Sequence, residues 1–266
     1  MEKIQIAVAC SENTEPYLDL MLTTMAKTID VERVQILLGV NSNRFNPDKV
    51  ECLGDFDHKL IKAVGGSKGT QGHGYCLDVL FNEINSTYGM FIDSDVVFFS
   101  KDWLDKLIDT LTDKRVIVGT GYYGKTWPKK PHIYGKNKKY NHFPNVITCL
   151  FLTNVLKECD VLFRNNGCLS AIVPEELAHL IGFEKGETII CDTGWQLPVN
   201  LLKNGYEGVV MYKEPSPEWG IGAKCFYGLE GELMVAHIGR GSSKPFSRNE
   251  VQKFAKSVLN RIDELK

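Results

Sequence analysis

Ile4-Gln-Ile-Ala-Val-Ala-Cys10 begins the stretch that decides the fold. This run is apolar apart from Gln5 and rich in β-branched residues, which indicates a buried strand. Residues 15–28 place apolar side chains at helical spacing, and Thr14 is the expected N-cap of that helix. Val34 to Val40 forms a second apolar run of strand character. A strand, a helix and a strand in this order predict a parallel sheet in an α/β protein.

The same alternation continues along the first half of the chain and predicts a doubly wound arrangement. The expected elements are a helix over Tyr75–Asn85, a strand over Tyr88–Val97 interrupted by two aspartates, a helix over Asp102–Leu111 and a strand over Val116–Gly121. Apolar segments at residues 146–152, 171–173 and 209–211 are expected to extend the core. A last amphipathic helix over Asn249–Leu265 is expected to pack across the sheet.

The composition is that of an ordinary globular enzyme, with 43% hydrophobic and 24% charged residues. The length of 266 residues suits one large α/β domain or two closely packed halves. A formal net charge of -2 favours neither a nucleic-acid nor a membrane partner. No apolar stretch approaches the roughly 18 residues that span a bilayer, and no signal-peptide pattern follows the first strand. The expected location is therefore the cytoplasm.

The eight cysteines form no CxxC pair, and several lie inside apolar runs, as in Ile147-Thr-Cys149-Leu-Phe. Regular short spacings are typical of zinc sites, and disulfides need an oxidising compartment. The expected state of these residues is therefore that of buried free thiols in a cytosolic protein.

Gly89-Met-Phe-Ile-Asp93-Ser-Asp95-Val-Val-Phe-Phe carries the strongest chemical signal in the chain. Two carboxylates lie between runs of large apolar residues, and buried charges are costly unless they are paired or bind a metal. Carboxylate oxygens suit magnesium or manganese, which also bind diphosphates. The alternative interpretation is that Asp93 and Asp95 only begin a turn.

Three motifs in series resemble the core of the GT-A fold glycosyltransferases. They are Gly72-His73-Gly74-Tyr-Cys-Leu-Asp78-Val-Leu, the strand ending in Asp93-Ser94-Asp95, and Trp103-Leu-Asp-Lys-Leu. The Gly-His-x-x-x-Leu-Asp pattern is most similar to a bacterial and phage subgroup that is family-2-like. The resemblance implies a GT-A fold, with a Rossmann-like, doubly wound mixed sheet. It implies a single domain of residues 1–266, with 1–121 as the nucleotide-sugar-binding half and 122–266 as the acceptor-binding half with the C-terminal helix.

The resemblance also implies a function. Such a chain would be a metal-dependent, hexosyltransferase-like enzyme that uses Mn²⁺ or Mg²⁺. It would move a sugar from a nucleotide-diphosphate sugar, most often a UDP-sugar, to an acceptor hydroxyl. A saccharide or a lipid-linked sugar is the default acceptor.

Positions that match the family are expected to contact the donor. Asp78 stands fifteen positions before the first aspartate, where such enzymes carry a residue that reads the donor. Ala9-Cys10-Ser11 corresponds to the base and ribose site, and Asn41 lies where many members place an acid against the base. Residues 65–74 could line the donor cleft, or could be a plain flexible connection. The expected donor contacts are Ala9, Cys10, Ser11, Asn41, Lys68, Gly72, His73, Asp78, Asp93, Ser94, Arg240 and Lys244.

Val235-Ala-His237-Ile-Gly-Arg240-Gly-Ser-Ser-Lys244-Pro is similar to the C-terminal metal and phosphate motif of several GT-A families. By this resemblance His237 completes a metal site with Asp93 and Asp95. Arg240 or Lys244 would neutralise the departing diphosphate. The alternative for His237 is an ordinary core histidine.

Ile189-Ile-Cys-Asp192-Thr-Gly-Trp195-Gln-Leu resembles the acidic motif that precedes a helix on the acceptor side. If the reaction inverts the anomeric centre, Asp192 would be the general base that deprotonates the acceptor hydroxyl. The alternative is that Asp192 and Thr193 cap the following helix, and the two roles are compatible. Trp195 would stack on a sugar or belong to the core.

Residues 125–142 interleave lysines with aromatic side chains, a composition that binds single-stranded nucleic acid by charge and stacking. A glycosyltransferase acting on modified bases in DNA is therefore one alternative, and a solvated lysine face on a loop is the plain interpretation.

Two further classes remain open. A sugar-nucleotide nucleotidyltransferase would carry a Gly-rich, basic loop after its first strand, whereas Cys10-Ser-Glu-Asn-Thr14 has neither glycine nor lysine. A non-catalytic sugar-binding module is disfavoured by the intact acidic residues and His237.

Overall fold

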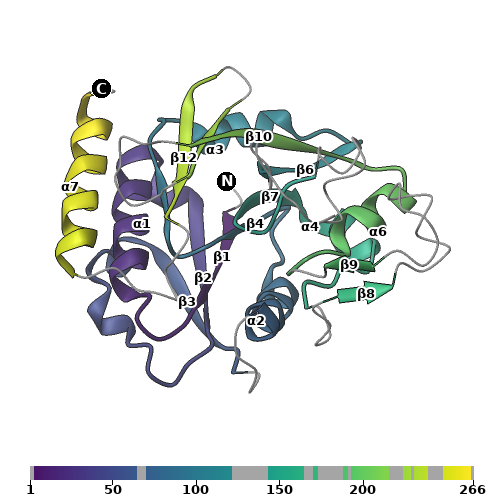
Figure 1. Cartoon of the computed structure of the whole chain (residues 1–266), viewed down its shortest axis with the longest axis horizontal. Helices are drawn as coiled ribbons and strands as arrows, with labels where there is room; N and C mark the ends of the chain where they lie inside the picture. Colours follow the sequence, from purple (N-terminus) through teal and green to yellow (C-terminus); the bar gives the residue numbers. More distant parts are fainter. Residues whose placement is uncertain are drawn as a thin grey trace.

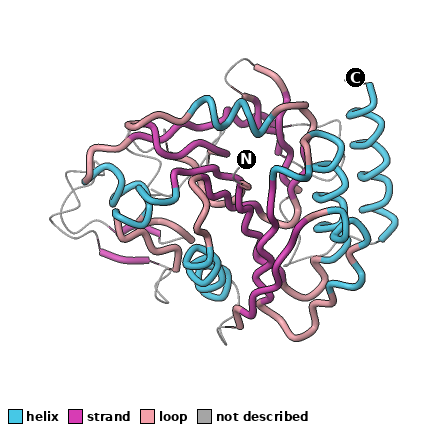
Figure 2. Tube along the Cα trace, turned by 180° about the vertical axis from the view of Figure 1, so that it is seen from behind, coloured by secondary structure: helices cyan, strands magenta, loops and turns pink. Residues whose placement is uncertain are grey.

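The computed structural model describes residues 3–64, 70–121, 143–164, 170–172, 188–190, 193–215, 224–228, 231–238 and 248–264. These residues form a mixed α/β fold with strands through the middle and helices around them (Figures 1 and 2). The strands of the large sheet follow the order β3-β2-β1-β4-β7-β6-β10-β11-β12-β5, and β8 pairs with β9 in a small second sheet.

The described strands have the following bounds: β1 Ile4–Cys10, β2 Val34–Val40, β3 Asp57–Lys62, β4 Tyr88–Ile92, β5 Val96–Phe98, β6 Arg115–Thr120, β7 Thr148–Leu152, β8 Ser170–Ile172, β9 Thr188–Ile190, β10 Glu207–Pro215, β11 Lys224–Tyr227 and β12 Leu233–His237. The described α-helices are α1 Glu15–Thr28, α2 Thr70–Glu83, α3 Trp103–Thr110, α4 Thr153–Glu158, α6 Leu197–Lys203 and α7 Arg248–Glu264. Short 3-10 helices lie at Val31–Arg33, Pro47–Lys49 and Glu51–Asp55.

The first strands form a parallel sheet, as the sequence predicts. β1 pairs in parallel with β2 in a register that runs from Ile4 opposite Val34 to Cys10 opposite Val40. β1 also pairs in parallel with β4, and β2 with β3. The carboxyl ends of β1, β2 and β4 therefore lie at one edge of the sheet, which is where α/β sheets bind ligands.

Antiparallel strands complete the sheet, so the predicted doubly wound mixed sheet is confirmed. β7 lies antiparallel between β4 and β6, and β10 runs parallel to β6. β11, β12 and β5 follow in antiparallel order.

One predicted strand is in fact two. The expected element over Tyr88–Val97 ends at Ile92, and the chain turns so that the backbone N–H of Val96 donates to the carbonyl of Asp93 (3.3 Å). β5 then pairs with β12 at the far end of the strand order. The two aspartates therefore lie in the turn that separates β4 from β5, and not within one continuous strand.

Helices cover both faces of the sheet. α1 and α3 share a core with one face of the strands, which includes Leu18, Met21 and Trp103. α2, α4 and α6 share a second core with the other face, which includes Leu80 and Phe91. Burial of these apolar faces is the main force that holds the layers together.

α7 packs beside α1 at one end of the molecule (Figure 1). Its residues Phe254, Val258 and Ile262 are buried with Tyr17 of α1 and with side chains of β5 and β12. The expected C-terminal helix is present, but it packs against α1 and the strands β5 and β12 at one end of the molecule and does not lie across the sheet as predicted. None of the described helices is long and apolar enough to cross a membrane.

Several local predictions differ from the structure. Thr14 is the N-cap residue of α1, as expected, but its hydroxyl donates back to the carbonyl of Ser11 (2.7 Å) and makes no cap bond to the helix. α2 begins at Thr70, five residues before the expected start at Tyr75. β3 is absent from the sequence prediction, because five of its six residues are exposed and the strand has no apolar alternation.

The described cysteines are free thiols, as expected. Cys10, Cys76 and Cys149 have no exposed surface. Burial raises the pKa of Cys76 to about 12, so this thiol stays protonated at neutral pH. Cys168 and Cys191 lie outside the described residues.

Candidate metal centre

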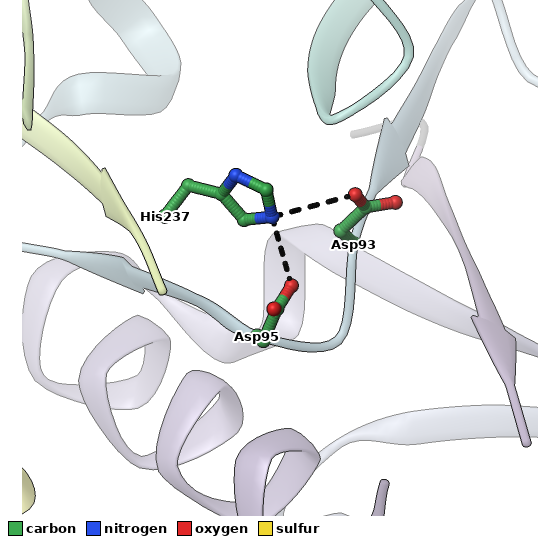
Figure 3. Close-up of side chains that lie close together, drawn as sticks. All are labelled: Asp93, Asp95 and His237. Carbon is green, nitrogen blue, oxygen red and sulfur yellow. Dashed lines mark ion pairs between the residues drawn. The ribbon is translucent and has the colours of Figure 1, made fainter. Parts of the chain in front are cut away.

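Asp93, Asp95 and His237 lie together at the carboxyl edge of the sheet (Figure 3). The two aspartates follow β4, and the histidine is the last residue of β12. The antiparallel pairing of β5 with β12 places His237 opposite Val96, directly after Asp95. The backbone N–H of Ile238 also donates to the carbonyl of Asp95 (3.0 Å). Strand pairing thus brings a distant histidine to the aspartate turn.

The geometry of these side chains fits a divalent cation. Nε2 of His237 lies 3.1 Å from Oδ1 of Asp95 and 3.6 Å from Oδ2 of Asp93. One ligand atom from each residue lies within 4.8 Å of the others. Neighbouring oxygen ligands around a cation bound at about 2.1 Å are about 3 Å apart, which is close to this spacing. The three expected metal ligands are therefore brought together.

Burial supports the same conclusion. Asp95 is 6% exposed and His237 is 8% exposed, whereas 24% of the Asp93 side chain is accessible. Two carboxylates this close together, one of them buried, repel each other unless positive charge lies close to them. The more open Asp93 leaves one side of the group accessible to a ligand.

His73 reaches the same group from α2. Its Nε2 lies 3.5 Å from Oδ1 of Asp93, whereas His237 faces Oδ2 of that carboxylate. Asp93 therefore lies between two imidazoles, one on each oxygen. The neighbouring Gly72 is buried at the start of the same helix.

Some of the residues expected to contact the nucleotide lie at the same edge of the sheet: Ala9, Cys10, Ser11, Asn41 and Ser94. The backbone N–H of Asn41 donates to the carbonyl of Cys10 (2.8 Å), so the ends of β1 and β2 are adjacent. Ala9, Ser11 and Asn41 are partly exposed there, and Ser94 is buried in the aspartate turn. Cys10 has no exposed surface, and burial raises the pKa of its thiol, so in this structure neither its side chain nor its backbone is open to a ligand.

Asp78 lies elsewhere on α2. Its Oδ1 accepts a hydrogen bond from the backbone N–H of Phe163 (2.7 Å), and its Oδ2 lies 3.5 Å from Nε of Arg164. Burial raises the pKa of this carboxyl. The structure therefore places Asp78 against the backbone of residues 163–164. Nothing in the sequence marks Phe163 or Arg164 as its partners, because that contact depends on the tertiary fold.

Four predicted site residues lie outside the described residues: Lys68, Asp192, Arg240 and Lys244. The lysine- and aromatic-rich segment 125–142 also lies outside them. After Asp192, the turn Thr193–Gln196 is described, and it leads into α6. Trp195 is 9% exposed within this turn.

No protein-family model matches the sequence, and no curated protein matches it. Solved structures do match the fold. The mannosyltransferase PcManGT from Pyrobaculum calidifontis, in complex with GDP-Man and Mn²⁺, has a TM-score of 0.54 and 10% identity, over 79% of this chain and 55% of that one. S. aureus TarS 1-349, in complex with UDP-GlcNAc, has a TM-score of 0.50 and 16% identity, over 97% of this chain and 66% of that one.

The likeness shows the fold that the sequence motifs predict. The chain has the GT-A fold found in glycosyltransferases, with a D-x-D motif at the end of a sheet strand. It spans 55% and 66% of the lengths of those two chains.

Proposed function

We propose that this protein is a metal-dependent glycosyltransferase that moves a sugar from a nucleotide-diphosphate sugar to an acceptor hydroxyl. The observation that carries the proposal is the grouping of Asp93, Asp95 and His237 at the carboxyl edge of a GT-A sheet. Two carboxylates and an imidazole are ligands that Mn²⁺ and Mg²⁺ accept. PcManGT was solved with Mn²⁺ and GDP-Man, and TarS 1-349 with UDP-GlcNAc, which supports both parts of the proposal.

Each described residue would have a distinct role. Asp95 and His237 are buried and would set the position of the cation, while the more exposed Asp93 would face the donor. The bound cation would supply positive charge that stabilises the departing nucleoside diphosphate. The side-chain amide of Asn41 can both donate to and accept from a base, and its backbone N–H donates to the carbonyl of Cys10, which lies between Ala9 and Ser11 in the chain.

Several finer assignments are part of the proposal. UDP is the donor nucleotide that we propose, with a hexosyl group as the sugar. The acceptor would be a saccharide or a lipid-linked sugar, bound by residues 122–266, with residues 1–121 binding the donor. Asp192 would act as general base, and Lys68, Arg240 and Lys244 would contact the donor phosphates. Transfer to modified bases in DNA would depend on residues 125–142, which lie outside the described residues.

A nucleotide titration tests the proposal directly. UDP, GDP and CDP would be titrated by calorimetry with Mn²⁺ and with EDTA. We expect one nucleotide to bind about tenfold or more tightly with Mn²⁺, because the cation bridges the diphosphate to the carboxylates. Release of that nucleotide from its sugar conjugates then identifies the donor.

Other outcomes would contradict the proposal. No binding of any nucleotide under either condition would exclude a nucleotide-sugar transferase. Formation of a nucleoside triphosphate from the nucleotide-sugar and pyrophosphate would instead indicate a nucleotidyltransferase. Metal-dependent binding without turnover of any donor would indicate a sugar-binding module.

His73 gives a second prediction about the metal centre. Replacing His73 with phenylalanine should lower the affinity for Mn²⁺ by about tenfold or more, because ligand carboxylates depend on their outer hydrogen-bonding partners. His73→Gln retains a donor and should lose less. Electron paramagnetic resonance of Mn²⁺ measures the affinity without any substrate.

His58 provides the matched control for this prediction. It lies on β3, where its Nδ1 is 3.0 Å from the carbonyl of Phe56. His58→Phe should leave Mn²⁺ binding unchanged. Equal Mn²⁺ affinity in His73→Phe and wild type would show that His73 does not support Asp93.

A further inference from the structure

α2 presents two residues, one turn apart, to the backbone of Phe163 and Arg164. Asp78 accepts the backbone N–H of Phe163 at 2.7 Å. A Cβ atom at Gly74 would lie 2.7 Å from Cα of Arg164 and 2.8 Å from the carbonyl oxygen of Phe163. Such contacts are closer than atoms tolerate, so this backbone lies against α2 only because residue 74 has no side chain.

The other side of Phe163 contacts the turn Thr193–Gln196. The carbonyl of Phe163 accepts the backbone N–H of Gly194 at 2.8 Å. Gly194 has a φ of +73°, and its carbonyl accepts the N–H of Leu197 at the start of α6 (3.0 Å). Both backbone polar groups of Phe163 are therefore used, one toward α2 and one toward the turn.

The side chain of Phe163 anchors this backbone segment in the hydrophobic core. The ring is fully buried, and its centroid lies 4.6 Å from that of Phe91 and 5.4 Å from that of Phe81. Both contacts are edge-to-face, the arrangement that aromatic pairs prefer. Phe163 cannot shift along α2 without disturbing this aromatic packing.

We propose that Asp78 is a positioning residue, which fixes Phe163 and, through it, the turn Thr193–Gln196 to the helix whose His73 contacts the metal centre. One helix, α2, then contributes to both proposed sites. His73 lies beside Asp93 at the proposed donor site, and Asp78 holds the turn before α6 at the proposed acceptor site. The roles of the two sites rest on the proposed function. This assignment replaces the donor-reading role that the motif resemblance implies for Asp78.

The surroundings of Asp78 favour positioning over donor recognition. Only 13% of its side chain is exposed, and Oδ1 is already bonded to Phe163. Oδ2 faces the guanidinium of Arg164 at 3.5 Å, which compensates in part for the burial of the charge. Little of the carboxylate is left to contact a nucleotide.

Hydrogen exchange of two backbone amides tests the proposal. In Asp78→Ala, the amides of Phe163 and Gly194 should exchange about tenfold or more faster than in wild type, measured by NMR. Asp78→Asn keeps an oxygen that accepts the Phe163 bond, so exchange should stay near the wild-type rate. UDP with Mn²⁺ should bind all three proteins with affinities within about twofold of one another.

Two further variants make the test independent of one substitution. Gly74→Ala leaves the carboxylate intact but displaces the 163–164 backbone, so the same two amides should exchange faster. If Asp78→Ala does not fold, Gly74→Ala still allows the same measurement. Glu83→Gln is the control on the same helix, because Glu83 forms an exposed ion pair with Lys59 of β3, away from Phe163. It should leave both amides unchanged.

Unchanged exchange in both Asp78→Ala and Gly74→Ala would overturn the proposal. Loss of UDP binding in Asp78→Asn and Asp78→Ala alike, with normal exchange, would also overturn it and return Asp78 to donor recognition. If the wild type binds no nucleotide, the proposed function fails, while the exchange rates still decide whether Asp78 positions the turn.

Discussion

Replacing Asp95 with alanine is expected to abolish Mn²⁺-dependent nucleotide binding and to lower sugar transfer by roughly 10²–10³-fold. Asp95 is 6% exposed, and its carboxylate lies 3.1 Å from Nε2 of His237. Its removal would leave one carboxylate and one imidazole at the centre. The fold should persist, because the carbonyl of residue 95 still accepts the Ile238 amide and β5 still pairs with β12.

Calorimetry with UDP and Mn²⁺, followed by donor turnover, measures this effect. Asp95→Asn is the conservative variant, since it retains the shape and loses the charge. Asp109→Ala removes an exposed carboxylate from α3 and should behave as wild type. Full metal-dependent binding in Asp95→Asn and Asp95→Ala would show that the centre does not bind the cation.

Replacing Phe91 with alanine is expected to lower the free energy of unfolding by about 3–5 kcal/mol. Phe91 has no exposed surface and lies in β4, two residues before Asp93. Its ring centroid is 4.6 Å from that of Phe163 and 5.1 Å from that of Phe151. Alanine would leave a cavity between these rings, which rigid strands on both sides cannot close.

Urea unfolding, followed by circular dichroism, checks this value. Leu60→Ala is the control, because Leu60 is 47% exposed on β3 and its truncation should change stability by about 0.5 kcal/mol or less. A loss below about 1 kcal/mol in Phe91→Ala would mean that the aromatic rings do not pack as described.

Much of the first half of the fold follows from local patterns. β1, α1 and β2 have the predicted bounds, because each is a continuous apolar run or a clear helical period. The sequence did not predict β3. This strand lies at the edge of the sheet, where its side chains are exposed and show no apolar pattern. The break between β4 and β5 was not predicted either, because the apolar run resumes directly after Asp93-Ser94-Asp95 and only the structure shows that the second part pairs with β12.

Part of the candidate metal centre could be predicted for a chemical reason. Asp93 and Asp95 interrupt an apolar run, which indicates polar groups at the edge of a buried sheet, whereas the role of His237 was implied only by the motif resemblance. Their distances could not be predicted, because they depend on the register of β5 against β12. The contact between His73 and Asp93 likewise depends on how α2 lies against the sheet.

Local sequence patterns predicted the strand-helix alternation, the type of sheet and the two aspartates of the candidate metal centre. These features depend on hydrophobic periodicity and on the cost of burying charge, which act over short stretches of chain. The contacts of Asp78 depend on the tertiary structure, because its carboxylate accepts the backbone N–H of Phe163 and the carbonyl of Phe163 in turn accepts the N–H of Gly194, which joins three distant segments. Almost every residue carries the same backbone N–H donor and C=O acceptor, so the side-chain pattern does not predict which backbone groups hydrogen-bond to each other.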